Sequence, residues 1–146
     1  MDLWQIITLV HIIGIALGVG GASIKLVLFM KSYYNKNFTP AYTVVAEPIS
    51  QLIFLGMILL TASGIGYALV GYPEGSSLLV KHVLVVLLWV VGPLISKVYG
   101  PRFITLAPKP SESPTSEFLQ VRKQLLVLEV LGTVCFYAVS IIGIIM

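Results

Sequence analysis

The chain has 146 residues, of which 58% are hydrophobic and only 10% are charged, with a formal net charge of +3. Soluble domains carry about 25% charged residues, so a chain of this composition must expose apolar side chains to lipid. Its single cysteine, Cys135, excludes an internal disulfide and a cysteine-based metal cluster. The sequence holds no nucleic-acid-binding motif, and we expect no nucleic-acid partner.

Four apolar runs are each long enough to cross a bilayer, which takes about 20 residues. They cover residues 3–30, 47–70, 78–97 and 122–145. Because lipid offers the backbone no hydrogen-bond partners, each run must be helical. The sequence therefore predicts an all-α integral membrane protein, a four-transmembrane-helix bundle that forms a single domain over 1–146. Polar connections are expected at 31–46, 71–77 and 98–121, the last of them proline-rich and poorly helical.

Basic residues predict the orientation of this bundle in the membrane. The first and third connections, with their flanks, hold seven of them, whereas the opposite side shows Asp2 and Glu74 with Lys81. The positive-inside rule then places these two connections in the cytoplasm and both termini outside, in a multi-pass protein of the cell membrane. The seven residues are Lys31, Lys36, Lys97, Arg102, Lys109, Arg122 and Lys123.

The first run carries an unusual stripe. At about 3.6 residues per turn, one helix face collects His11, Gly14, Gly18, Gly21 and Lys25. Glycines on one face let another helix or a flat ligand come close to the backbone. An imidazole at the head of such a groove suits a metal ligand.

The three later runs also have small and weakly polar stripes at helical spacing, and in a membrane bundle such faces turn inward. We therefore expect all four stripes to face one interior. The stripes comprise Glu47, Ser50, Phe54, Met57, Thr61 and Gly64 in the second run, His82, Val85, Trp89, Gly92 and Ser96 in the third, and Glu129, Gly132 or Thr133, Phe136, Ser140 and Gly143 in the fourth.

The only two histidines, His11 and His82, both fall in the outer half on the predicted topology. Two imidazoles at one depth, beside glycines that leave room for a porphyrin plane, predict bis-histidine ligation of haem b iron. Lys81 could pair with a haem propionate, serve as a ligand or anchor the helix at the interface. Trp89 could flank the porphyrin or only pack. The simpler interpretation is that each histidine forms a hydrogen bond within the bundle or lies at the membrane interface.

Two further ionisable residues lie deep in the runs, where charges are costly. Glu129 needs a partner, and Lys25 lies at a similar depth. We expect a Lys25–Glu129 pair that acts as a structural lock, with a proton or substrate path as the alternative. Glu47 precedes Pro48 and is expected to cap the start of the second helix.

Three short segments carry a resemblance to a known family. They resemble the HemJ and CopD-like group of small integral membrane proteins. The segments are His11-Ile-Ile13 with its downstream glycines and then Leu26-Val-Leu-Phe29, Leu60-Thr-Ala-Ser-Gly-Ile65, and Val80-Lys-His-Val-Leu-Val85. The resemblance implies a membrane bundle that in several members binds b-type haem. For HemJ-type members it implies a protoporphyrinogen oxidase whose hallmark histidine and lysine correspond to His11 and Lys81. For CopD-like members it implies copper handling.

These observations predict a membrane-embedded b-type haem protein for electron transfer or haem-linked redox chemistry, with a quinol or redox protein as partner. A HemJ-type oxidoreductase is the first alternative. A haem-free transport subunit, for copper or another cargo, or an assembly subunit is the second. Gly14-x-x-x-Gly18 is also a helix-association motif, so a homodimer is a further expectation.

Overall fold

The computed structural model describes residues 1–71, 76–109 and 111–145, and all regular structure in these ranges is helical. Four helical segments are long and apolar enough to cross a membrane, which confirms the predicted all-α four-helix membrane bundle. The elements in chain order are α1 (Leu3–Tyr34), the 3₁₀ helix η1 (Lys36–Phe38), α2 (Thr39–Leu69), α3 (Ser76–Pro93), the π-helix η2 (Leu94–Tyr99), α4 (Gly100–Leu106) and α5 (Ser116–Ile145).

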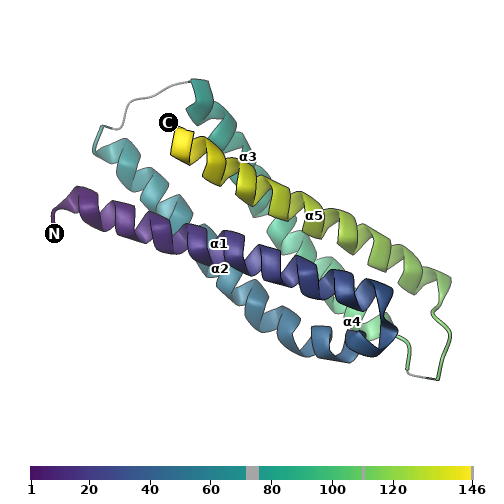
Figure 1. The fold of residues 1–146 in the computed structure, drawn as a ribbon. Helices are drawn as coiled ribbons and strands as arrows, with labels where there is room; N and C mark the ends of the chain where they lie inside the picture. Colours follow the sequence, from purple (N-terminus) through teal and green to yellow (C-terminus); the bar gives the residue numbers. More distant parts are fainter. Residues whose placement is uncertain (72–75, 110, 146) are drawn as a thin grey trace.

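The four long segments run side by side, up and down (Figure 1). Both chain termini lie at one end of the bundle, which we call the terminal end (Figure 1). The connections from α1 to α2 and from α4 to α5 lie at the other end, the loop end. Apolar side chains such as Ile12, Val83 and Val127 are exposed on the outside of the bundle, as expected of a surface that contacts lipid.

Two predicted connections are mostly helical. Residues 31–46, expected as a loop, continue α1 to Tyr34 and then form η1 and the start of α2. Pro40, at the first turn of α2, supplies the helix start that we assigned to Pro48, so Pro48 lies inside the helix. Glu47 is therefore not a cap. The expected loop at 98–121 is helical up to Leu106 and again from Ser116.

α1 and α2 form the tightest helix pair, because glycines remove the side chains between them. A Cβ atom on Gly56 would lie 2.6 Å from the backbone nitrogen of Gly18. A Cβ on Gly14 would lie 2.9 Å from Leu60 Cγ and 3.2 Å from the Gly56 carbonyl oxygen. Backbone-to-backbone packing of this kind is how helices associate in lipid, where the hydrophobic effect offers no driving force.

α5 packs against both α1 and α3, and aromatic side chains fill the core near the loop end. Phe29 and Phe103 are almost completely buried, with ring centroids 5.5 Å apart. Tyr42 joins both rings edge-on, at centroid distances of 5.2 Å and 5.8 Å. This cluster ties α1, α2 and α4 together at the loop end.

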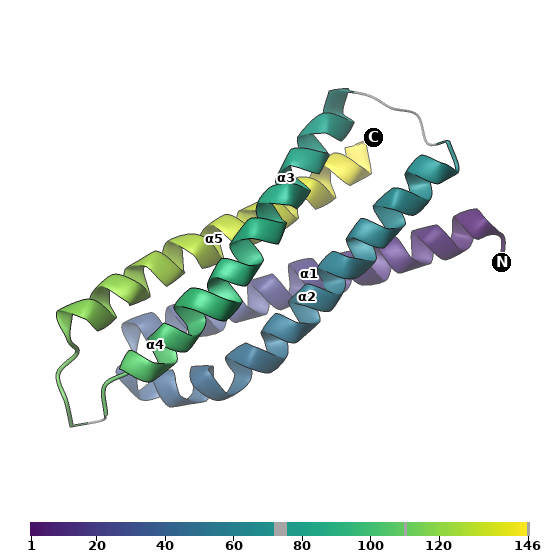
Figure 2. The same cartoon turned by 180° about the vertical axis from the view of Figure 1, so that it is seen from behind.

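α2 and α3 contact each other far less than α1 contacts α2 (Figure 2). Pro93 has no N–H to donate, and the chain after it widens into the π-helix η2. At its end the Gly100 N–H donates to the Ile95 carbonyl, and a Cβ on Gly100 would lie 2.8 Å from that oxygen. Glycine at position 100 therefore permits the wide turn that shapes the wall facing α2.

Candidate functional site

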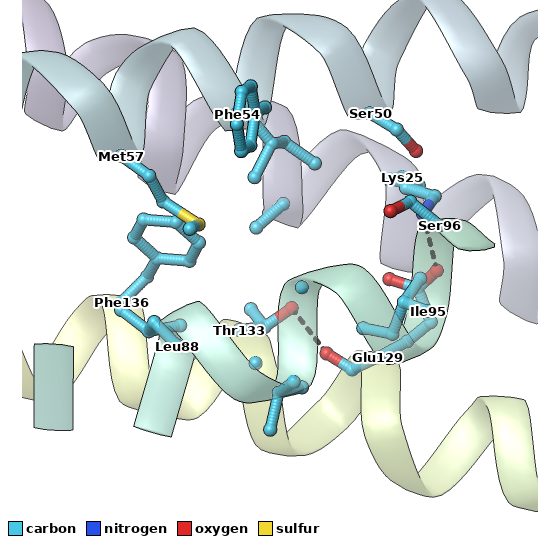
Figure 3. Close-up of a pocket in the computed structure, with 15 residues that line it drawn as sticks. Lys25, Ser50, Phe54, Met57, Leu88, Ile95, Ser96, Glu129, Thr133 and Phe136 are labelled. Atoms are coloured by element: carbon cyan, nitrogen blue, oxygen red, sulfur yellow. Dashed lines mark hydrogen bonds and ion pairs between the residues drawn. The ribbon is translucent and has the colours of Figure 1, made fainter. Parts of the chain in front are cut away.

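Two adjoining cavities lie between α2 and the α3–η2–α4 segment, and we call them together the α2–α3 cavity. Figure 3 shows the lining of the smaller one. The smaller has a volume of about 60 Å³ and lies toward the middle of the bundle. The larger has a volume of about 490 Å³ and extends to Pro101 and Ile104 near the loop end. Both are lined by Lys25, Ser50, Phe54, Ile95, Ser96 and Glu129.

An ion pair lies against both cavities. Lys25 Nζ on α1 and Glu129 Oε1 on α5 are 2.8 Å apart, and the two side chains are only 5% and 4% exposed. The predicted pairing of these residues is confirmed (Figure 3). Removing two charges from water costs several kcal/mol per ion, which the attraction between them offsets only with good geometry and further hydrogen bonds.

Further hydrogen bonds to this pair are scarce in the part of the chain that the structure describes. Glu129 Oε1 is buried with no hydrogen-bond partner there, and its contact with the Lys25 ammonium is an ion pair. Tyr42 lies near enough to Glu129 to interact with it electrostatically. An ammonium has three N–H donors and a carboxylate about four acceptor positions, so the pair keeps unused capacity toward the cavity.

The remaining lining is divided between apolar walls and a polar rim. Phe54 and Ile95 face each other across the cavity, and Leu125 forms part of its floor. The rim is formed by exposed polar residues, Glu47 and Gln51 on α2 and Ser96 and Lys97 on η2. The site thus combines an apolar volume with one buried polar point, the pattern typical of small-molecule sites.

Part of each stripe predicted to turn inward lies at this site, but Gly64 of the second stripe and His82 of the third are exposed, contrary to the prediction. Ser50, Phe54 and Met57 of the second stripe face Gly92 and Ser96 of the third, and members of the fourth stripe lie beside them. Phe136 and Thr133 come from that fourth stripe (Figure 3). Helical periodicity therefore located residues of the cavity wall, whereas the buried face of α2 is formed mainly by other residues, such as Gly56, Leu60 and Ser63.

His11 lies nearer the terminal end, outside the lining of both cavities. Its Nδ1 is 2.9 Å from Ser63 Oγ, and its ring meets Tyr67 edge-on at 5.6 Å. Ser63 Oγ also lies 3.0 Å from the Leu60 carbonyl, and when it donates there, His11 donates from Nδ1 to Ser63. A neutral imidazole in this tautomer keeps its lone pair on Nε2.

The structure turns Lys81, and not His82, toward the bundle. The Lys81 ammonium lies 3.2 Å from where a Cβ on Gly143 of α5 would be, and Lys81 interacts electrostatically with His11. His82 is exposed on the outside of α3. Successive residues on a helix point about 100° apart, so only one of these two neighbours can face inward. The arrangement does not favour the predicted His11–His82 pair.

The glycine stripe does not leave a groove for a porphyrin. Gly14 packs on Leu60 and Gly56, and a Cβ on Gly18 would lie 2.6 Å from Phe136 Cε1. A Cβ on Gly21 would lie 2.8 Å from Ile53 Cγ1. Of the two alternatives for this stripe, the contacts favour close packing of another helix over a flat ligand, because α2 and Phe136 fill the glycine face. The same contacts occupy the Gly14-x-x-x-Gly18 motif within the chain, so this motif is not free to join two protomers.

Trp89, expected beside a cofactor, connects α3 to α2. Its Nε1–H donates to Thr61 Oγ1 at 3.1 Å, and its ring meets Phe54 edge-on at 5.6 Å. These contacts bring α2 and α3 together just beyond the cavity, on the side of the terminal end. Trp89 therefore bounds the α2–α3 cavity.

Sequence reasoning missed Tyr42, Ser63 and the rim residues Gln51 and Lys97. Ser63 fell outside the second stripe, and Tyr42 lay in a segment expected to be a loop. Pro93 with Gly100 was the available signal for the cavity, because this pair interrupts regular helix geometry. Among the described residues, no group of three or more His, Cys, Asp or Glu side chains could hold a metal ion.

Comparison of the chain with protein-family models, with curated proteins and with solved structures finds no match. The HemJ and CopD-like resemblance therefore stays a prediction. The functional argument depends on the geometry of the chain itself.

Proposed function

We propose that this chain is a membrane-embedded binding protein for a small, membrane-soluble molecule, which occupies the α2–α3 cavity. The observation that carries the proposal is a cavity of about 490 Å³ with a buried ion pair in its wall. Ligand sites typically enclose about 300–1,000 Å³, with mostly apolar walls and a few converging polar groups. This function belongs to the transport or assembly class among the alternatives that the sequence leaves open.

The sparse contact between α2 and α3 supports a route into the cavity from the bilayer. Phe54 is exposed and lines both cavities, so one wall of the site also faces outward. The seven basic residues at or near the loop end place this end in the cytoplasm by the positive-inside rule. In that orientation both termini are outside the cell membrane, and the ligand enters from the inner leaflet.

Filling the cavity tests the proposal directly. Ser50 lines both cavities on α2, whereas Leu52 is exposed on the same helix and lines neither. We expect Ser50→Trp to remove small molecules that co-purify with the protein, measured by native mass spectrometry in a mild detergent. Leu52→Trp, the matched control, should retain them. Equal ligand content in the two variants would contradict the proposal.

A second candidate function is b-type haem chemistry at the terminal end, in electron transfer with a quinol or redox protein or in a HemJ-type oxidoreductase. The observation that favours it is the hydrogen bond from His11 Nδ1 to Ser63, which orients the ring and leaves Nε2 as a potential iron ligand. Lys81 is the nearby cation. Haem would supply one-electron chemistry, and this chain would hold it through His11 and steer its propionates with Lys81.

An absorption spectrum tests this second function. The haem proposal predicts a Soret band in the purified protein and sharpened bands after reduction with dithionite. Loss of the bands in His11→Ala and Lys81→Ala but not in His82→Ala would support the Lys81 arrangement. Loss in both histidine variants would restore bis-histidine ligation. A protein that stays colourless after haem is supplied contradicts haem binding.

A further inference from the structure

The proposed function leaves open what kind of molecule the α2–α3 cavity takes, and the charges around it narrow the choice. Four charged residues line the two cavities, two of each sign: Lys25 and Lys97, Glu47 and Glu129. The deep pair is neutral as a unit, and the rim pair is exposed. An ionised head group placed beside Lys25 and Glu129 would add one uncompensated charge to a buried site, which is strongly unfavourable.

The hydrogen-bonding capacity of the Lys25–Glu129 pair also favours an uncharged ligand head group. Lys25 has three N–H donors, and its ammonium forms an ion pair with Glu129 Oε1 at 2.8 Å. Glu129 is a carboxylate whose Oε1 accepts from no other described group. A ligand group that fits must therefore accept from the Lys25 ammonium and donate to the Glu129 carboxylate. A hydroxyl does both through a single oxygen atom.

We infer that the site binds an uncharged, membrane-soluble molecule whose head is a hydroxyl, as in a long-chain alcohol, a sterol or a quinol, held between Lys25 and Glu129 by one accepted and one donated hydrogen bond. This inference rests on the proposed function. The apolar body lies along Phe54 and Ile95, and the head lies against α1 and α5. If the Lys25–Glu129 pair only stabilised the fold, it would contact no ligand head group, and the protein would not discriminate among ligands by their head groups.

A series of ligands with one body and three heads tests the inference: oleyl alcohol, oleic acid and oleylamine. Each is titrated against the full-length protein in detergent, with binding read by native mass spectrometry. We expect oleyl alcohol to bind at least about tenfold more tightly than the other two, because loss of one good buried hydrogen bond or gain of one buried charge corresponds to that ratio. Tighter binding of the acid or the amine would overturn the inference.

Charge variants make the test specific to this pair. In Glu129→Gln the lone ammonium should shift the preference to oleic acid, and in Lys25→Met the lone carboxylate should shift it to oleylamine. The double variant K25M/E129Q is neutral at this position and should bind all three ligands without preference for the alcohol. If the single variants fail to fold, the double variant alone decides, because retained preference for the alcohol would overturn the inference.

Failure of the proposed function gives a different result. If the Ser50→Trp variant binds each of the three ligands as tightly as the wild-type protein does, the cavity is not the binding site. If Ser50→Trp blocks binding but the head-group preferences are absent or reversed, the cavity is the site and only the inference about its ligand is wrong.

Discussion

Burial of Lys25 and Glu129 costs desolvation free energy, and the same two residues offer a polar contact to a ligand. Each charge is about as buried as a core leucine, and the two atoms that meet are 2.8 Å apart. Breaking such a pair by removing one partner leaves a charge without compensation, whereas removing both charges is often neutral. Folding alone therefore does not require this ion pair. A ligand in the adjoining cavity gives the pair a function, because the two charged groups can bind it.

This reasoning predicts a non-additive effect on stability. Lys25→Met and Glu129→Gln should each lower the free energy of unfolding by about 3–5 kcal/mol, whereas K25M/E129Q should cost much less than the sum of the two. The free energies of unfolding of the three variants are measured by titrating each detergent-solubilised protein with denaturant. Additive losses would indicate that the two residues act independently, contrary to the observed contact.

At the scale of the element, the α1–α2 pair is held by the absence of side chains. The Cβ of an alanine at position 56 would lie 2.6 Å from the Gly18 backbone nitrogen, which cannot rotate away as a side chain could. A Cβ at Gly64, on the same helix, has no atom within 4 Å. Gly56 therefore tests the close approach of the two helices, and Gly64 is the matched control on the same helix.

Gly56→Ala should destabilise the protein by about 1–3 kcal/mol, the usual cost of forcing extra volume into a tight contact. Gly64→Ala should be neutral or slightly stabilising, because alanine favours the helix by up to about 1 kcal/mol relative to glycine. Thermal unfolding of the two variants in the same detergent provides the comparison. A loss in Gly64→Ala as large as that in Gly56→Ala would show that helix contact is not the cause.

For the molecule as a whole, the charge asymmetry predicts a single orientation in the membrane. Leu69 is exposed near the terminal end and Ser111 is exposed in the connection at the loop end. Placed separately in a Cys135→Ala background, Leu69→Cys should react with a membrane-impermeant thiol reagent in intact cells. Ser111→Cys should react only after the cells are opened. The reverse pattern would place the α2–α3 cavity toward the outer leaflet.

The sequence by itself determined the helical class, the four spans and the Lys25–Glu129 pairing. The reason is that lipid permits only helices here, and a charge buried in a bundle requires a partner of opposite sign. Only the tertiary structure decided that α2 and Phe136 fill the glycine face, and that Lys81 rather than His82 turns toward His11. These outcomes depend on helix rotation and on interhelical distances, which spacing along one chain does not contain. The cavity also depends on an interhelical distance, because it exists only where α2 and α3 stay apart.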